Sequence, residues 1–139
     1  MPFWRCYYHI IWATKHRLPL ITPDIELVVI QCAKQKAAEL SSPLLAINTV
    51  ADHVHVAAMI PPKIAISEWV RHLKGFTTFE VNAAFPDLPH SFRWQSDFAV
   101  LSYGAKTLPF IVEYIERQKE HHAQNTLEPY LEQLESNSD

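Results

Sequence analysis

Two histidines in the middle of the chain, His53 and His55, have the clearest potential for chemistry. They lie in the segment DHVHV at 52–56, whose valines predict a β-strand that ends before Pro61-Pro62. Side chains alternate along a strand, so both imidazoles point to one face, roughly 7 Å apart at ~3.3 Å per residue. Neutral imidazole is the commonest metal ligand in proteins, so the pair predicts a divalent-metal site. Taken alone, two histidines at this spacing are as typical of an ordinary strand, where they are surface or half-buried residues, as they are of a metal site.

A second stretch with chemical potential lies far along the chain, where Tyr114 and Gln118 are four residues apart. At ~100° per residue they share one side of a helix that we predict over 107–124. A tyrosine hydroxyl is a possible nucleophile, and an amide oxygen suits a hard divalent ion. Taken alone, the two residues are more typical of a core-edge tyrosine and a solvated glutamine. We interpret His121-His122 as surface residues of the same helix.

The elements that must position these residues follow the order β-α-β-β-α-β-α. Strands are predicted over 5–14, 44–50, 54–60 and 94–103, and helices over 23–40, 67–85, 107–124 and, in a short tail, 126–134. This order is that of the split βαβ, ferredoxin-like plan in the α+β class. We therefore expect a four-stranded antiparallel sheet with helices on one face and an extra C-terminal helix that carries the tyrosine.

Local signals refine this plan. The first strand is too apolar for a solvent-washed position, so we place it centrally in the sheet. Thr22 and Ser67 are the expected N-caps of the first two helices. The turn at 51–52 predicts an antiparallel hairpin, and the poor strand formers at 95–97 suggest an interrupted fourth strand.

Composition indicates one domain over 1–139 with a short acidic tail at 126–139. The hydrophobic content of 48% suffices for a core. No apolar run approaches the ~20 residues of a membrane span, and no signal-peptide pattern opens the chain, so we expect a cytoplasmic protein without membrane contact. Cys6 and Cys32 are interpreted as reduced thiols. With only two glycines, the chain cannot form a glycine-rich phosphate loop.

The charge distribution matters more than the net charge of −3. From residue 113 onward there are seven acids and two bases, which leaves ten bases and eight acids in the first 112 residues. Two basic pairs, Lys15 with Arg17 and Arg71 with Lys74, are candidate contacts to nucleic-acid phosphates. The alternative is a plain solvated face.

Five spaced motifs follow one another in the order found in a known family. They are YHIIWATKHR at 8–17, DHVH at 52–55, LKG at 73–75, WQ at 94–95 and YIERQKEHH at 114–122. These motifs resemble those of the single-tyrosine HUH transposases (HUH stands for His, hydrophobic residue, His) of small insertion sequences and of their relatives associated with repeated palindromic elements. The resemblance covers about residues 7–130.

The resemblance implies an enzyme that cuts and rejoins single-stranded DNA at hairpins through a 5′-phosphotyrosine. By motif position, Tyr114 is similar to the nucleophile, and His53, His55 and Gln118 are similar to the ligands of Mg²⁺ or Mn²⁺. The family also implies a homodimer with composite sites, in which the tyrosine helix of one subunit meets the HUH strand of its partner.

Two other interpretations remain open. The first is a catalytically degenerate module on the same fold that binds single-stranded nucleic acid through strand aromatics. It is suggested by the acidic balance and by SDFAV at 96–100, where the family usually has an acidic residue followed by Gly-Tyr-Gly-Ala. The second is a histidine-triad phosphoryl-transfer enzyme, but that signature requires a third alternating histidine and position 57 is Ala57.

Overall fold

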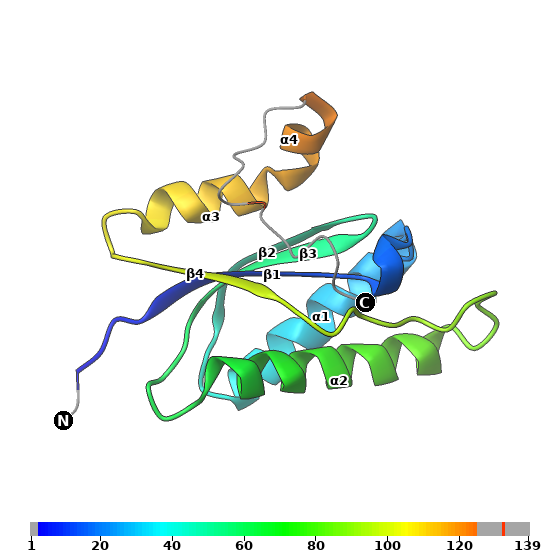
Figure 1. Ribbon diagram of the computed structural model, residues 1–139, viewed down its shortest axis with the longest axis horizontal. Helices are drawn as coiled ribbons and strands as arrows, with labels where there is room; N and C mark the ends of the chain where they lie inside the picture. Colours follow the sequence, from blue (N-terminus) through cyan, green and yellow to red (C-terminus); the bar gives the residue numbers. More distant parts are fainter. Residues whose placement is uncertain (1–2, 125–131, 133–139) are drawn as a thin grey trace.

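The fold is a single sheet with helices on both faces, as the computed structural model in Figure 1 shows for residues 3–124 and residue 132. The strands are β1 (Tyr7–Ala13), β2 (Leu44–Val50), β3 (His53–Met59) and β4 (Ala99–Tyr103). The helices are α1 (Pro23–Glu39), α2 (Ile66–Ala84), α3 (Leu108–Glu116) and α4 (Gln118–Gln124), with a 3₁₀ turn, η1, over Lys15–Arg17. None of the described helices is long and apolar enough to cross a lipid bilayer.

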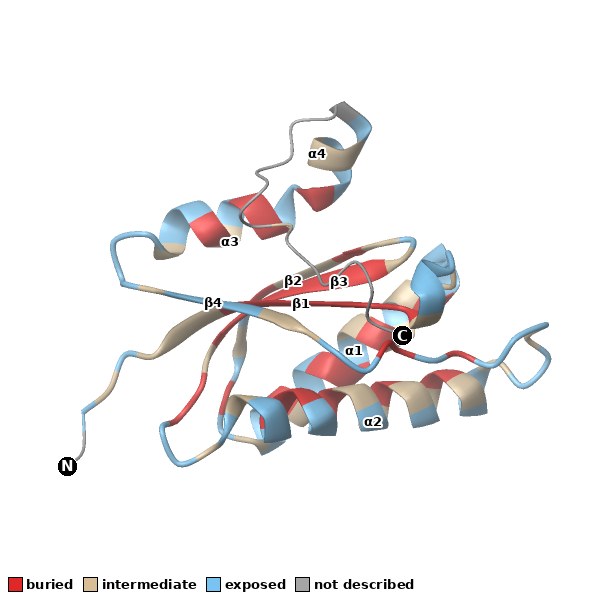
Figure 2. Ribbon diagram, viewed as in Figure 1, coloured by how far each residue is buried: buried red, intermediate tan, exposed pale blue. Residues whose placement is uncertain are grey.

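The sheet is antiparallel in the order β2-β3-β1-β4, so the α+β class and the four-stranded sheet are confirmed. β1 lies in the centre, as its apolar sequence predicts, and its Ile11 pairs with His55 of β3. Figure 2 shows that β1 and β3 are buried along most of their length. The centre of the sheet is therefore covered on both faces, and the histidines of β3 lie in the protein interior.

Helices α1 and α2 cover one face of the sheet and form the main core with it (Figure 1). Val54 and Val56 of β3 point into this core. The side-chain oxygen of Thr22 accepts a hydrogen bond from the Ile25 amide at 3.3 Å, so the predicted N-cap of α1 is confirmed. The predicted cap of α2 is wrong: α2 begins at Ile66, and Ser67 therefore lies inside the first turn.

Helices α3 and α4 cover the opposite face of the sheet (Figure 1). A second, smaller core joins Ala46 of β2 and Ala57 of β3 to Ile111, Tyr114 and Ile115 of α3. The single helix predicted over 107–124 is wrong in one respect, because the helix is interrupted at Arg117, between the end of α3 and the start of α4. The tail helix predicted over 126–134 lies outside the described residues, except for residue 132.

Two irregular segments complete the sheet. Thr14 and Trp94 form an isolated antiparallel bridge, and regular pairing of β4 starts only at Ala99, so the predicted interruption of the fourth strand is confirmed. Within η1, His16 and Arg17 have φ values of 55° and 54°. Positive φ is uncommon for residues with a Cβ, and it turns the chain sharply beside the end of β1.

Candidate active site

The candidate site lies between β3 and the α3–α4 pair, and β3 contributes its two histidines. His53 and His55 point away from the valine core, with ring centroids 5.1 Å apart and exposed fractions of 2% and 0%. This is the common face that strand alternation predicts. Buried imidazoles need partners for their nitrogens, so the neighbours of each ring decide its chemistry.

The Nδ1 atoms of both histidines are held from behind. Nδ1 of His53 lies 2.7 Å from Oδ1 of Asp52, and Nδ1 of His55 lies 2.8 Å from Nε2 of His9 on β1. Because each ring is anchored through Nδ1, both Nε2 atoms face the α3–α4 side. A metal-binding histidine is oriented in this manner by a hydrogen bond at its other nitrogen.

Tyr114 and Gln118 reach the site from α3 and α4. The Tyr114 ring packs edge-on to His55 with centroids 6.3 Å apart, and its hydroxyl donates a hydrogen bond to the carboxylate of Glu132. Gln118 is fully buried, and its Nε2 donates to Glu132 at 3.1 Å. The structure therefore brings together all four residues of the predicted catalytic and metal-binding set.

Two further residues join the cluster that sequence reasoning missed, His122 and Glu132. One ligand atom from each of His53, His55, His122 and Glu132 lies within 4.8 Å of the others. The interpretation of His122 as a surface residue is therefore corrected. The signal was present, because residues 114, 118 and 122 continue one four-residue spacing. Glu132 follows the undescribed segment 125–131, and no spacing rule connects it to the histidines.

The neighbouring His121 has a different role from His122. Its ring stacks on the Tyr114 ring, with centroids 4.5 Å apart and an angle of 22° between the planes. The two adjacent histidines of α4 thus contact different parts of the site. His121 contacts Tyr114, and His122 lies against His53.

The electrostatics of the cluster favour a neutral His55 beside an ionised Glu132. Burial lowers the pKa of His55 to about 4, and burial followed by the nearby His55 lowers that of His9 to about 3. Burial alone raises the pKa of a carboxyl, but the HUH histidines, with Nε2 of His53 at 3.5 Å and Nε2 of His55 at 3.1 Å, outweigh it and hold the pKa of Glu132 well below its ordinary range.

His53 behaves differently from His55. Burial lowers its pKa, but two carboxylates outweigh that effect, with Asp52 at 2.7 Å from Nδ1 and Glu132 at 3.5 Å from Nε2, so the net pKa is raised. Asp52 stays ionised, since its own burial is overcome by His53 and Arg17, which bring its pKa to about 2. One HUH histidine therefore has a carboxylate behind it and the other has an imidazole.

The residues present fit a divalent metal ion. Nε2 of His53, Nε2 of His122 and Oε1 of Gln118 are buried and have no hydrogen-bond partner within the described part of the chain. Unpaired buried nitrogen and oxygen acceptors that face one another are costly unless a cation binds them. A mixed set of imidazole, carboxylate and amide donors suits Mn²⁺, and Mg²⁺ less well because it prefers oxygen ligands.

A family comparison now decides the class of protein. The model of the family described as "Transposase IS200 like" matches residues 2–118, which include the HUH strand, Tyr114 and Gln118. The chain belongs to this transposase family. It is therefore an enzyme that acts on DNA, and the recognition made from the five motifs is confirmed.

Individual relatives of this transposase agree with the assignment. It is 29% identical over 121 residues to the transposase of insertion sequence element IS200 from Salmonella typhimurium, covering 84% of this chain and 79% of that protein. It is 26% identical over 115 residues to the ISDra2 transposase TnpA of Deinococcus radiodurans, covering 80% and 82%.

Solved structures show the same fold. A crystal structure described as that of a transposase from Deinococcus radiodurans R1 matches with a TM-score of 0.68 and 28% identity, covering 84% of this chain and 93% of that one. A REP-associated tyrosine transposase bound to a REP hairpin matches with a TM-score of 0.62 over the whole of this chain and 94% of that one. At 15% identity, the second likeness shows the fold alone.

In this single chain the candidate site is formed by β3, α3 and α4 together. The sequence analysis expected the tyrosine helix of one subunit to meet the HUH strand of a partner. Here the Tyr114 ring lies against His55 of the same chain. A single chain tests neither the homodimer nor the exchange of tyrosine helices between its subunits.

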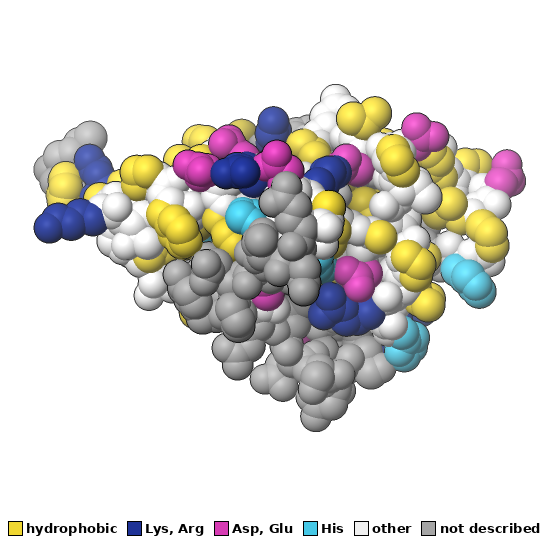
Figure 3. Space-filling model, turned by 90° about the horizontal axis from the view of Figure 1, so that it is seen from above, with side chains coloured by type: hydrophobic (Ala, Val, Ile, Leu, Met, Phe, Trp, Pro, Cys, Tyr) yellow, Lys and Arg dark blue, Asp and Glu magenta, His cyan; other side chains and the backbone are white. Residues whose placement is uncertain are grey.

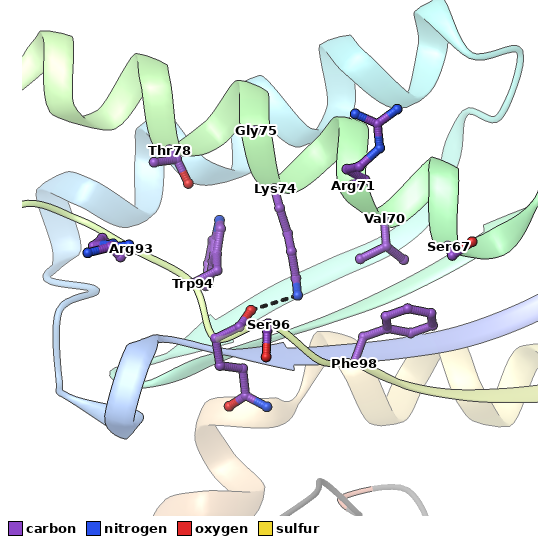
Figure 4. Close-up of a pocket in the computed structure, with 11 residues that line it drawn as sticks. Ser67, Val70, Arg71, Lys74, Gly75, Thr78, Arg93, Trp94, Ser96 and Phe98 are labelled. Carbon is purple, nitrogen blue, oxygen red and sulfur yellow. Dashed lines mark hydrogen bonds between the residues drawn. The ribbon is translucent and has the colours of Figure 1, made fainter. Parts of the chain in front are cut away.

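The four predicted DNA-binding residues fall into two groups. In η1, Arg17 donates from Nε to Oδ2 of Asp52 at 3.3 Å, so it lies at the edge of the site. Arg71 and Lys74 line a pocket of about 470 Å³ between α2 and residues 93–98 (Figure 4). Nζ of Lys74 donates to two carbonyls of that segment at 2.8 Å, and Arg71 pairs with the exposed Glu68.

Arg93 connects these two groups and was not singled out from the sequence. Its side chain lines the same pocket, and its carbonyl accepts a hydrogen bond from the Lys15 amide at 2.9 Å. Basic residues thus follow one another from the edge of the active site to the pocket. By contrast, acidic and basic side chains are interspersed over α3 and α4, as Figure 3 shows for that face.

Proposed function

We propose that this transposase cleaves and rejoins single-stranded DNA at hairpin-bearing ends through a 5′-phosphotyrosine intermediate. The observation that carries the proposal is the placement of the Tyr114 hydroxyl on the same carboxylate that faces the HUH histidines. A phenol, a carboxylate and a cluster of metal donors converge at one buried place. Transfer of a phosphoryl group to a tyrosine requires a nucleophile, a proton acceptor and stabilisation of charge on the phosphate.

Each residue has a role in this reaction. The Tyr114 oxygen attacks the scissile phosphorus, the phenolic proton passes to Glu132, and the bond from phosphorus to the DNA 3′-oxygen breaks. The 3′-oxygen leaves as a hydroxyl after it takes a proton from solvent. A divalent ion held by His53, His55 and Gln118 would offset the negative charge that develops on the phosphate oxygens. The phosphotyrosine keeps the energy of the phosphodiester, so the 3′-hydroxyl can rejoin the strand without ATP.

DNA binding in this proposal uses the basic residues around the site. Arg17 lies next to the HUH histidines, and Arg71, Lys74 and Arg93 surround the pocket beside Trp94. Cationic side chains near an aromatic ring suit single-stranded DNA, because phosphates and bases both find partners. Hairpin recognition is supported by the structurally similar transposase that is bound to a REP hairpin.

We further propose a C₂ homodimer that works in the cytoplasm, where its DNA substrate is found. Among the residues that the structure describes, strands β2 and β4 each pair on one side only, so each leaves a sheet edge for another chain. Val100 and Leu101 of β4 are also exposed. Edge-to-edge pairing through β4 would place these apolar side chains in the interface.

The test is a denaturing gel of protein incubated with Mn²⁺ and labelled single strands from the flanks of its own gene. The wild type should form a covalent adduct with the strand 3′ of the cut, and Tyr114→Phe should form none. Tyr103→Phe is the matched control, since burial raises the pKa of Tyr103 to about 12 and makes it a poor nucleophile. It should keep the adduct.

Two results would contradict the proposal. An adduct that persists in Tyr114→Phe would move the chemistry to another residue. The absence of an adduct in the wild type, on a hairpin that the protein binds, would favour the alternative of a catalytically degenerate module that binds single-stranded nucleic acid.

A further inference from the structure

We infer that His9 is a positioning residue that keeps Nδ1 of His55 hydrogen-bonded in either tautomer and so frees Nε2 of His55 for the metal. The inference rests on the metal-ligand role in the proposed function. His9 lies on β1 and pairs with Ala57, two residue pairs along the ladder from His55, and its exposed fraction is 1%. The two rings stack with centroids 5.0 Å apart and planes at 24°, and Nε2 of His9 lies 2.8 Å from Nδ1 of His55.

Without a metal, the contacts of His55 favour the tautomer with the proton on Nε2, and this nitrogen then has no lone pair for a metal ion. Its Nε2 lies 3.1 Å from the carboxylate of Glu132, which is an acceptor only. The Nε2 of His55 therefore carries the proton, its Nδ1 is an acceptor, and His9 must donate from Nε2. Both hydrogen bonds of His55 are satisfied in this arrangement.

Metal binding requires the opposite arrangement. Nε2 of His55 must offer its lone pair, so the ring proton moves to Nδ1, and His9 must then accept at Nε2 and carry its own proton at Nδ1. Each neutral ring keeps one proton in both states, and only the ring positions change. A backbone carbonyl or a carboxylate behind His55 would accept but could not donate, whereas an imidazole does both.

A further observation about His9 supports this role. Its Nδ1 is buried and has no hydrogen-bond partner among the residues that the structure describes. Nδ1 of His9 can gain or lose a proton without breaking a hydrogen bond, so the two tautomers of His9 cost similar amounts. A buried polar atom without a partner is otherwise destabilising, and a phenylalanine would fill this position without it. A histidine at this position is thus better explained by its contact with His55 than by packing.

His53 provides the contrast within the same site. Its Nδ1 faces the ionised Asp52 at 2.7 Å, an acceptor only, so Nε2 of His53 always presents its lone pair while the ring is neutral. His9 supports Nδ1 of His55 in the same way, but it permits both tautomers of His55. His55 can therefore donate from Nε2 to Glu132 in the absence of metal and offer the lone pair of Nε2 when a metal ion binds.

The test compares His9→Phe, which keeps the ring shape, with His9→Gln, whose amide can donate or accept near the position of Nε2. Mn²⁺ affinity is measured by titration calorimetry on the full chain. His9→Phe should weaken Mn²⁺ binding by about 10–100-fold, the usual effect of losing such a support. His9→Gln should recover most of the affinity, and His16→Ala, an exposed histidine in η1, should leave it unchanged.

A second readout follows the tautomers directly. Nitrogen-15 NMR of the imidazoles should show the proton of His55 on Nε2 in the metal-free wild type and on Nδ1 after Zn²⁺ is added as a diamagnetic probe. Wild-type Mn²⁺ affinity in His9→Phe, or a proton on Nδ1 of His55 in both states, would overturn the inference and leave the proposed function standing. A wild type that binds no Mn²⁺ would overturn the metal role of His55 as well.

Discussion

The neighbours of each histidine at this site decide its protonation. His53 and His55 lie on the same strand and are both buried, but Nδ1 of His53 faces the carboxylate of Asp52 and Nδ1 of His55 faces the imidazole of His9. The pKa of His53 is therefore raised and that of His55 is lowered. Metal ligation needs both to be neutral, because a protonated imidazole has no lone pair. Glu132, held ionised in the same cluster, would supply the negative charge that compensates a bound cation.

The first residue-scale prediction concerns the donor set. Replacing Glu132 with Gln removes a charge from the cluster, so Mn²⁺ affinity should fall by about tenfold or more in calorimetry, within the range typical of site substitutions. The double variant His53→Ala/His55→Ala should bind no Mn²⁺ while its circular dichroism stays that of the wild type. Glu116→Gln, an exposed acid at the end of α3, is the control and should change nothing. Unchanged or tighter binding in Glu132→Gln would mean that the carboxylate occupies the site without being a ligand.

The second residue-scale prediction concerns stability in acid. The pKa values of His9 and His55 fall from 6.5 in the unfolded chain to about 3 and about 4 in the fold. Between pH 6.5 and 4 the unfolded state therefore binds more protons, and the free energy of unfolding should decrease as the pH falls, by up to about 1.4 kcal/mol per pH unit for each histidine. The raised pKa of His53 acts in the opposite direction, chiefly above pH 6.5, where the stabilisation grows as the pH falls.

Urea unfolding at pH 7.5 and pH 5 measures the effect. His9→Phe lacks one of the histidines whose pKa is lowered, so its stability should fall less over this interval than that of the wild type. An equal loss in both proteins would show that His9 titrates normally in the fold.

At the scale of elements, alternation and capping could be predicted from sequence because they are local. The common face of His53 and His55 and the Thr22 cap are decided by neighbours a few residues away. The break at Arg117 and the entry of Glu132 depend on contacts far along the chain. The carbonyl of Glu116 accepts a hydrogen bond from the Asn48 side chain of β2 at 3.1 Å. The periodicity of a sequence cannot predict a contact between residues so far apart in the chain.

The third prediction concerns the element that carries the ligands. Lys119 ties α4 to the sheet and to α1: its Nζ donates to Glu26 at 2.5 Å, to the Asn48 side chain at 2.6 Å and to the Thr49 carbonyl at 3.2 Å. Lys119→Met should release α4 and displace Gln118. Since misplacement by about 1 Å can cost 10²-fold in rate, we expect adduct formation to slow by about tenfold.

Global stability should change little in the same variant. Lys119 is more than half exposed, and exposed ion pairs contribute at most about 1 kcal/mol. Lys106→Met, an exposed lysine in the turn before α3, is the matched control and should keep the wild-type rate. A rate in Lys119→Met that equals that of the control would show that the packing of α3 alone positions the site.

At the scale of the whole molecule, the distribution of charge separates two faces. Basic residues follow one another from η1 to the pocket beside α2, while α3 and α4 carry paired acids and bases. The net charge of −3 hides this separation, because acids concentrate after residue 113. DNA that approaches the basic side would reach the site past Arg17, at the edge where the HUH strand begins.

The last prediction concerns how two copies share the chemistry. We expect a dimer by light scattering at tens of micromolar, joined through a sheet edge. Tyr114 is packed with Ile111 and Ile115 on the sheet of its own chain, and Asn48 and Lys119 add polar ties, so we expect each subunit to use its own tyrosine. The test mixes two inactive proteins, Tyr114→Phe and the double variant His53→Ala/His55→Ala, under conditions in which subunits exchange. A mixed dimer with sites inside each chain has no complete site and should form no DNA adduct. If the α3–α4 pair were exchanged between subunits, one site of the mixed dimer would be complete, and the return of the adduct would establish the composite arrangement instead.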